Sequence, residues 1–385
     1  MAKFEANKAR EKANATAVEK SFQANERERE LLRQEREQEQ GSFGCSRIYS
    51  NLWSGYKETF APVAKMNTVR VLLSVAINNA WPLFQMDVKN DFLHGELEEK
   101  VFMKLPPGHP QSNNPEMVCK FHKSIYGLKQ SPRAWYTKLS HVLERVGFCW
   151  SNADSSLFVC SSTSGNLMVL IYVDDLIVTG DNMSEISALK QHLNHKFVIK
   201  DLNILKYFLG IEMAHSHKGC FLNQRKYVID LLREANMTDC KHAHTPLNSN
   251  LKLQSHGDLI PNIEYYQRLV GKLIYLTITR PNIAYAMSLV SQFMHAPSMD
   301  HMKILHRVLR YLKGFIGRGI LMRNNNHTHI SGYTDADWAG NALDCKSITG
   351  FCTFVEGNLV TWKSKKQSVV TRSSTKVSCY GFDYL

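Results

Sequence analysis

The sequence lacks the segments that would place the protein in a membrane or outside the cell. No apolar run approaches the roughly 18–20 residues of a membrane-spanning helix, because the most apolar stretch, residues 167–179, contains Asp174 and Asp175. The first residues, 1–12, have no apolar segment of the kind found in secretory signals. We therefore expect an intracellular protein, in the cytoplasm or the nucleus, with no membrane partner.

Metal-binding cysteine patterns are missing as well. The nine cysteines are scattered along the chain without a C-x-x-C pair, and none joins a histidine at zinc-finger spacing. This distribution favours reduced thiols and argues against structural zinc.

Negative charge is scarce. Lys and Arg together number 47 against 35 for Asp and Glu, so the formal net charge is +12. The first forty residues hold nine basic residues and nine Glu, and the whole excess therefore lies in residues 41–385. Such an excess indicates a polyanionic partner, with nucleic acid the obvious candidate. The neutral first segment favours either a solvated, partly frayed helical arm or a helix that binds a partner.

The hydrophobic pattern after about residue 51 predicts an α+β protein, and 385 residues suit two or three domains. Helices are expected at 68–80, 131–147 and 184–196, and strands at 82–88, 167–173 and 176–179. Residues 216–325 should be mainly helical, and one helix that ends at Gly314 has an apolar face of Met302, Leu305, Val308, Leu309 and Leu312. From residue 326 strands prevail, at 330–334, 350–355 and 359–363.

Three aspartates interrupt these apolar strands. Asp87 lies at the end of one strand, and Asp174 and Asp175 lie where a hairpin is expected to turn. An Asp pair at a turn is ordinary, but uncompensated charge inside buried strands costs several kcal/mol. Carboxylates brought together need a cation, and hard oxygen ligands with phosphates as further partners suit Mg²⁺. Two such ions can clamp the attacking and leaving oxygens of a phosphoryl displacement, so the sequence suggests nucleotidyl transfer on a nucleic acid.

Longer motifs make the suggestion specific. The segment Tyr172-Val173-Asp174-Asp175 resembles the catalytic YxDD box of reverse transcriptases. Further segments resemble, in the family's order, the Pol polyprotein of copia-type LTR retrotransposons: residues 55–63, 85–95, 126–135, 208–210, 279–282 and 310–314. The resemblance covers roughly residues 52–380, and the chain is identified by it as a member of this family.

The resemblance implies a right-hand polymerase with a palm, incomplete fingers, a helical thumb and a ribonuclease H-like tail. In this division residues 1–50 are a charged helical or disordered arm outside the family pattern, 51–215 the partial fingers and palm, 216–325 the mostly helical thumb and connection, and 326–385 a truncated, β-rich ribonuclease H-like segment. The implied substrates are dNTPs and an RNA or DNA template–primer. The oligomeric state stays open.

The resemblance also assigns residues. Asp87, Asp174 and Asp175 match the catalytic carboxylates that hold Mg²⁺, and Asp335 matches the first metal ligand of the ribonuclease H site. Phe92 matches the aromatic gate against a ribose 2′-hydroxyl, although it could be an ordinary core residue. Tyr126 and Gly127 match the lining of the nucleotide pocket, and could also form a turn that feeds a helix.

Two further elements match the parts that hold the primer and template. Phe208, Leu209 and Gly210 resemble the element that grips the primer end, or form a plain strand and turn. A stripe of cations on the helix that ends at Gly314 can follow a phosphate backbone, or can be a solvated face. The stripe consists of Lys303, Arg307, Arg310 and Lys313.

The sequence departs from the family at three places. The basic strand pair of the family's fingers has no counterpart in residues 1–50, and Asp91 stands where the family has a small residue beside the nucleotide. Ser378 stands where the ribonuclease H site has its glutamate, and the sequence stops at Leu385, before the later carboxylates. We therefore expect no ribonuclease H activity, and a three-stranded tail with one apolar face uncovered and open to proteases.

Two functions remain after these observations. The first is an RNA-directed DNA polymerase core that uses Mg²⁺, and the second is an inactive relic that retains only nucleic-acid binding. In a third, weaker view, the first fifty residues are a partner-binding module joined to the remnant. The missing fingers and Asp91 lead us to expect weak nucleotide addition.

Overall fold

The computed structural model describes residues 60–105, 108–110, 114, 117–248, 257–340, 344–370 and 373, together with the backbone of 48–50. The chain divides into two compact units. The first comprises Met1–Ala61 and Asn90–Val142, and the second comprises Pro62–Lys89 and Leu143–Leu385. Residues 1–47 of the predicted arm and Ser378 lie outside the described residues.

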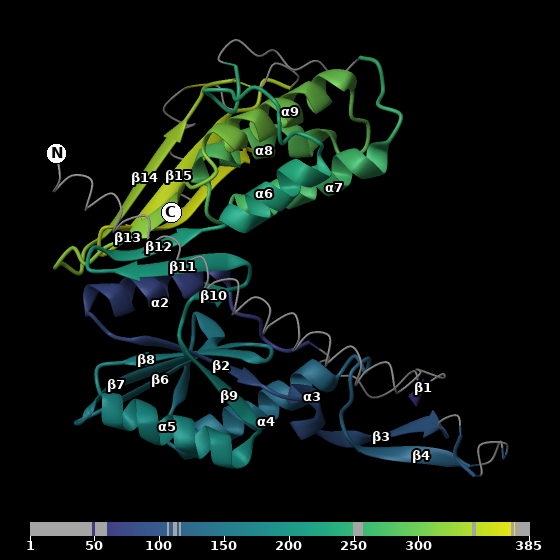
Figure 1. Ribbon diagram of the computed structural model, residues 1–385, viewed down its shortest axis with the longest axis vertical. Helices are drawn as coiled ribbons and strands as arrows, with labels where there is room; N and C mark the ends of the chain where they lie inside the picture. Colours follow the sequence, from purple (N-terminus) through teal and green to yellow (C-terminus); the bar gives the residue numbers. More distant parts are fainter. Residues whose placement is uncertain are drawn as a thin grey trace, which may run out of the picture. The chain divides into compact units, whose positions relative to one another are not determined.

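A six-stranded antiparallel sheet forms the centre of one part of the second unit (Figure 1). Its strand order is β5-β6-β7-β8-β2-β9. The strands are β2 (Leu83–Val88), β5 (Cys149–Ser151), β6 (Asp154–Ser162), β7 (Gly165–Tyr172), β8 (Asp175–Gly180) and β9 (Ile199–Ile204).

Two helices cover opposite faces of this sheet (Figure 1). Helix α2 (Met66–Asn78) packs its buried apolar residues against Leu170 and Ile177. Helix α5 (Met183–Lys196) covers the other face, where the Lys190 ammonium lies 3.6 Å from the centre of the Phe84 ring. Asn182 caps α5 by accepting hydrogen bonds from the first backbone amides of the helix.

A four-stranded sheet packs on the other side of α2. Its strands run in the order β10-β11-β12-β13, and their apolar residues share one core with those of α2. The strands are β10 (Tyr207–Phe208), β11 (Ile211–Ser216), β12 (Gly219–Asn223) and β13 (Gly319–Met322). Strands β12 and β13 lie within the region that the sequence predicts to be mainly helical.

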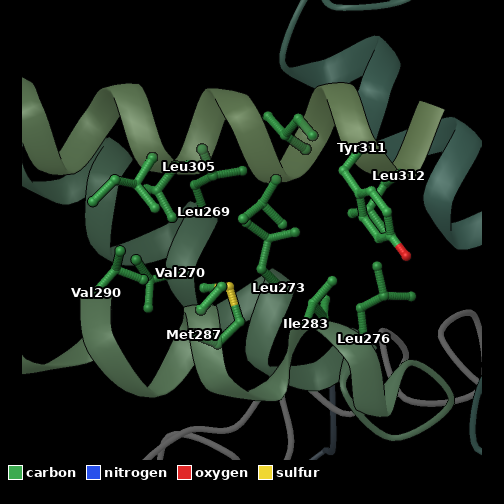
Figure 2. Close-up of a cluster of buried hydrophobic side chains, with 14 of the residues drawn as sticks. Leu269, Val270, Leu273, Leu276, Ile283, Met287, Val290, Leu305, Tyr311 and Leu312 are labelled. Atoms are coloured by element: carbon green, nitrogen blue, oxygen red, sulfur yellow. The ribbon is translucent and has the colours of Figure 1, made fainter. Parts of the chain in front are cut away.

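A helical bundle connects β12 to β13. Its elements are α6 (Arg225–Glu234), α7 (Ile263–Leu276), the 3₁₀ turn Pro281–Ile283, α8 (Ala284–Val290), the 3₁₀ turn Ser291–Phe293 and α9 (Met299–Gly314). Figure 2 shows how leucines of α7 meet Met287 of α8 and Leu305 of α9 in one apolar core. Helix α9 begins with a capping box between Ser298 and His301. No described helix has the length and apolar character to cross a membrane.

A three-stranded sheet follows, with the order β14-β15-β16. Its strands are β14 (Ile330–Ala336), β15 (Ile348–Val355) and β16 (Asn358–Lys366). Helix α2 covers part of one face, because Arg70 of α2 lies 3.9 Å from the Trp362 ring and Val360 is buried, while Ile330 and Tyr333 of β14 are 77% and 63% exposed. The Ser74 hydroxyl of α2 donates to the Val355 carbonyl at 2.8 Å. The expectation of an uncovered apolar face is therefore contradicted where β15 and β16 pack on α2, and β14 is exposed as expected.

The described residues of the first unit form a small antiparallel sheet and two helices. The sheet has the order β1-β3-β4. Its elements are β1 (Ile48–Ser50), α3 (Asp91–His94), β3 (Glu96–Lys104), β4 (Val118–Lys123) and most of α4 (Ser131–Arg145). The predicted mixture of helix and sheet is thus confirmed, while the names palm, fingers, thumb and ribonuclease H remain predictions.

Candidate active site

The hairpin that carries Asp174 and Asp175 turns one residue earlier than predicted. Strand β7 ends at Tyr172 and β8 begins at Asp175, so Val173 and Asp174 form the turn. Val173 has a φ of +54°, in the left-handed region that β-branched residues rarely adopt. Because successive side chains of a strand point to opposite faces, this shift decides which aspartate shares a face with Asp87.

Four residues form a row across the neighbouring strands β7, β8, β2 and β9. Asp175 lies opposite Tyr172 on one side and opposite Asp87 on the other. Asp87 in turn lies opposite Lys200 of β9. Directly opposed residues share a face, with Cβ atoms ~4.5–5.5 Å apart. We call Tyr172, Asp175, Asp87 and Lys200 the carboxylate row.

Neighbouring groups hold the carboxylates of this row in place. Gln85 is 2% exposed, and its side-chain amide donates to Oδ1 of Asp175 at 2.8 Å. The Val88 amide donates to the Asp174 carbonyl at 2.9 Å, which ties the turn to the end of β2. Asp87 is 7% exposed. Like charges opposed across strands repel, and Lys200 at the end of the row offsets part of that repulsion.

The donor set suits a magnesium ion that also binds a substrate. Mg²⁺ is usually held by one or two protein carboxylates, with water and phosphate oxygens completing its shell. Among the described residues, no group of three or more His, Cys, Asp or Glu side chains lies close enough to hold a metal ion. Asp87 and Asp175 therefore fit an ion completed by phosphate, and an all-protein metal cage is not formed by these residues.

The predicted nucleotide-pocket residues gather in the first unit. The rings of Phe92 and Tyr126 lie 4.5 Å apart, centre to centre, and Phe92 is only 9% exposed. Gly127 has a φ of +93°, which favours glycine at this turn. The structure thus brings these three residues together at the start of the loop before α4.

Asp91, which stands where the family has a small residue, lies inside the first unit. Its side chain is completely buried, and one carboxylate oxygen accepts a hydrogen bond of 2.6 Å from the Tyr126 hydroxyl. This hydrogen bond joins Asp91 to the predicted nucleotide-pocket residue Tyr126. The effect of the Asp91 charge on nucleotide addition stays a prediction.

The predicted primer-end element is a tight hairpin. Phe208 pairs with Ile211, and Leu209 and Gly210 form the turn with φ of +49° and +72°. Two successive positive φ angles are the mark of a type I′ turn. The buried Phe208 ring meets the Tyr172 ring edge-on at 5.9 Å. The hairpin is therefore in contact with the carboxylate row.

Three cations of the predicted phosphate-binding stripe are engaged within the protein. Arg307 donates to the Thr245 hydroxyl at 2.9 Å, Arg310 to the Lys241 carbonyl at 2.9 Å and Lys313 to the Cys240 carbonyl at 2.7 Å. Lys303 pairs with Asp300 of the same helix at 2.7 Å. These contacts fasten the segment before α7 to α9. The binding of a phosphate backbone by this stripe stays a prediction, and it would compete with these bonds.

Asp335, the predicted ribonuclease H ligand, lies on β14. Its side chain is exposed and accepts a hydrogen bond from the Ala336 amide at 2.9 Å. The nearby Asp337 accepts from the Ile348 amide at 2.6 Å and so fixes the end of β15. Neither residue belongs to a metal-binding group within the described part of the chain.

The sequence was compared with known families and curated proteins. The family described as "Reverse transcriptase (RNA-dependent DNA polymerase)" matches residues 47–249, just over half of the chain. The chain belongs to the reverse transcriptase family. The match begins four residues before the predicted boundary at residue 51, and it includes every residue of the carboxylate row.

Similar proteins include Pol polyproteins of plant transposons. The retrovirus-related Pol polyproteins from transposons RE2 and RE1 of Arabidopsis thaliana are each 42% identical over 322 residues, which cover 83% of this chain and 22% of each relative. The retrovirus-related Pol polyprotein from transposon TNT 1-94 of Nicotiana tabacum is 35% identical over 336 residues, which cover 83% of this chain and 25% of that relative. The chain thus spans about a quarter or less of the length of these relatives. The predicted resemblance to copia-type Pol polyproteins is confirmed.

Three residues around the candidate site were not among those predicted from the sequence. Gln85 was signalled by alternation, because a residue two positions before Asp87 in a strand must share its face. Lys200 had no local signal, because β9 and β2 are more than a hundred residues apart in the chain. Tyr275, whose hydroxyl donates to the Leu209 carbonyl, comes from α7 and gave no signal either.

The Phe208–Ile211 hairpin, which the sequence predicts to hold the primer end, gives a first test of this geometry. We expect Gly210→Ala to lower the free energy of unfolding by about 2 kcal/mol, because an alanine pays ~1–2 kcal/mol in the left-handed region. A Cβ atom at Gly210 would also lie 2.3 Å from the Tyr275 hydroxyl oxygen. Urea denaturation measures the change, and Gly271→Ala, whose Cβ would meet nothing within 4 Å on α7, is the control. Equal stability of Gly210→Ala and the parent would contradict this geometry.

Proposed function

We propose that the carboxylate row is the nucleotidyl-transfer site of an RNA-directed DNA polymerase core. The substrates would be dNTPs and a primed RNA or DNA template. One observation carries the proposal: Asp87 and Asp175 lie directly opposite each other on neighbouring strands, so that two carboxylates share one face of a sheet that is otherwise largely buried. An otherwise apolar sheet retains such a pair at a cost in stability, which is the pattern expected of a site that binds a cation.

Each residue of the site then has a defined task. Asp87 and Asp175 would hold Mg²⁺, with Asp174 at the turn as the third carboxylate of the motif. When bound, Mg²⁺ supplies a positive charge that stabilises the attacking and leaving oxygens of an in-line displacement. Gln85 orients Asp175 through its 2.8 Å hydrogen bond. Lys200 limits the repulsion between the carboxylates before the substrate arrives.

Residues outside the row would position the substrates. Phe92, Tyr126 and Gly127 would line the pocket of the incoming dNTP, and the Phe208–Gly210 hairpin would hold the primer end. Positioning of the reacting groups accounts for much of the decrease in the activation barrier of phosphoryl transfer. The contact between Phe208 and Tyr172 supports the second assignment, since it joins the hairpin to the row.

A second function, nucleic-acid binding without catalysis, is favoured by one observation. The formal net charge of +12 attracts a polyanion whether or not the carboxylates catalyse a reaction. The expectation that Asp91 weakens nucleotide addition stays a prediction. The absence of ribonuclease H activity stays a prediction.

The two functions differ in a binding and extension experiment. The purified chain would be titrated into a fluorescent RNA template annealed to a DNA primer, and extension would be followed in the same samples after dNTPs and Mg²⁺ are added. Binding followed by extension supports the polymerase. Binding with no extension supports the second function. If the chain neither binds nor extends the primer, both functions are rejected.

The role of Gln85 can be tested by its replacement. We expect Gln85→Leu to raise the Mg²⁺ concentration for half-maximal extension about tenfold or more, because a hydrogen bond to a charged acceptor contributes ~1.5–3 kcal/mol. Gln191→Leu on the exposed side of α5 is the matched control. A magnesium requirement that Gln85→Leu leaves unchanged would show that the amide does not position Asp175.

A further inference from the structure

A cavity of about 610 Å³ lies between the end of α2, the β11–β12 hairpin and the segment after β13. Its walls include Trp81 from the chain after α2, His217 and Lys218 from the hairpin turn, and Arg323 after β13. No lining residue belongs to the carboxylate row or to the primer-end hairpin. We call this space the α2–β12 cavity.

The charge of the α2–β12 cavity is positive and uncompensated. No Asp or Glu lines it. Lys218 and Arg323 are exposed, and within the described part of the chain neither side chain pairs with a carboxylate. The cations of α9 behave differently, since each of them already has a partner in the protein. The cavity therefore offers cations that can neutralise an anion without first breaking an internal bond.

The backbone holds the cationic walls in place. The Arg323 amide donates to the Asn358 side chain at 2.8 Å, and the Arg323 carbonyl accepts from the same side chain at 2.9 Å. Gly219, with a φ of +126°, brings the hairpin so close to β13 that a Cβ there would lie 2.0 Å from the Met322 carbonyl oxygen. Lys218 and Arg323 thus extend from two strongly fixed backbone segments.

Trp81 supplies an aromatic wall. Its ring packs partly against the core around α2, and its amide donates to the Ala76 carbonyl at 2.7 Å. The turn that places it needs a φ of +53° at Ala80, a conformation that glycine adopts more readily. This turn is the left-handed end of α2, in which the Ala80 amide also donates to the Ile77 carbonyl at 3.2 Å. It holds Trp81 at the wall of the cavity.

We propose that the α2–β12 cavity binds single-stranded nucleic acid. Lys218 and Arg323 bind backbone phosphates and Trp81 stacks on a base, which is the combination used for strands bound without sequence preference. The exposed side chains of His217, Lys218 and Arg323 leave the rim open to a continuing strand. This site lies outside the proposed polymerase residues and gives the chain a second hold on a template or primer strand.

Crosslinking locates the strand. A six-nucleotide RNA containing 4-thiouridine is irradiated with the full chain, and the crosslinked peptide is identified by mass spectrometry. We expect the crosslink on the peptide that contains Trp81, and its loss in Trp81→Leu. A crosslink found only on other peptides would overturn the proposal.

Salt dependence tests the cations. Fluorescence anisotropy of the same RNA gives the slope of log K against log salt, which should become shallower by about 1.4 in Lys218→Gln/Arg323→Gln, since two phosphates contribute ~0.7 each on a single strand. Trp81→Leu should weaken binding about tenfold without changing the slope. The control Lys196→Gln/Lys241→Gln removes two exposed cations elsewhere and should leave the slope and affinity nearly unchanged. An unchanged slope in the first pair would overturn the proposal.

Two further arms separate this proposal from others. Lys218→Arg/Arg323→Lys should retain binding, which excludes loss through misfolding. If a mononucleotide competes as well as the hexamer, the cavity binds single nucleotides, and the proposal that it binds a nucleic-acid strand is contradicted. Primer extension measured in the same samples distinguishes the two proposals. Extension without the Trp81 crosslink rejects only the proposal of strand binding in the cavity. The crosslink without extension rejects only the proposal of polymerase activity.

Discussion

Replacing Asp87 with Asn should reduce single-nucleotide addition by about a thousandfold or more, which corresponds to roughly 4 kcal/mol of transition-state stabilisation. The amide has nearly the same shape but lacks the charge that holds Mg²⁺. The free energy of unfolding should stay the same or rise slightly, because Asp87 faces Asp175 and their repulsion opposes folding. Loss of activity without loss of stability identifies a functional carboxylate.

A second carboxylate of the same sheet provides the control for Asp87. Asp201 lies opposite Met86, one position from Asp87 and therefore on the other face of β2. It pairs with Lys190 of α5 at 2.9 Å. Asp201→Asn should keep nearly full activity. Comparable losses in Asp87→Asn and Asp201→Asn would contradict the assignment of the site to one face.

Arg70→Ala should lower the free energy of unfolding by about 3 kcal/mol or more. The side chain is 7% exposed and donates to the Val360 carbonyl at 3.1 Å and the Ile278 carbonyl at 2.8 Å. Burial lowers the pKa of Arg70 to about 10, so the guanidinium is still charged at neutral pH. Its removal leaves two carbonyls without a donor and a gap beside Trp362, and each lost charged hydrogen bond costs ~1.5–3 kcal/mol.

Urea denaturation with limited proteolysis measures the consequence for the β14–β16 sheet. Arg145→Ala, on an exposed position, should change stability by less than about 0.5 kcal/mol. In the parent chain, cleavage within residues 344–366 should be slow, and Arg70→Ala should accelerate it. Rapid cleavage of this segment in the parent would show that α2 does not protect it.

Elements with a strong local pattern could be predicted from the sequence. Strand β2 and helix α5 were expected within one residue of their observed bounds, because alternation and helical periodicity depend only on neighbouring residues. The sequence also predicted that three aspartates would gather around one hairpin. It misplaced the turn, since the choice between Val173-Asp174 and Asp174-Asp175 depends on an unfavourable φ at Val173 that the surrounding sheet imposes.

Contacts between distant segments could not be predicted. Arg70 has no local signal of its role, because the two backbone carbonyls that accept from it lie more than two hundred residues away in the chain. The pairing that places Lys200 opposite Asp87 is equally non-local. The engagement of the α9 cations within the protein could not be predicted either. The backbone carbonyls that accept from them, such as that of Lys241, produce no recognisable pattern in the amino-acid sequence.

The central claim is that the carboxylate row of this chain transfers nucleotides with Mg²⁺. Single-nucleotide addition by the unmodified chain, on a DNA primer annealed to an RNA template, tests it most directly. We predict a primer one nucleotide longer when the complementary dNTP and Mg²⁺ are present, and no product when Mg²⁺ is chelated or Asp87 is replaced by Asn. Primer–template that is bound but stays unextended at saturating dNTP and Mg²⁺ would contradict the claim.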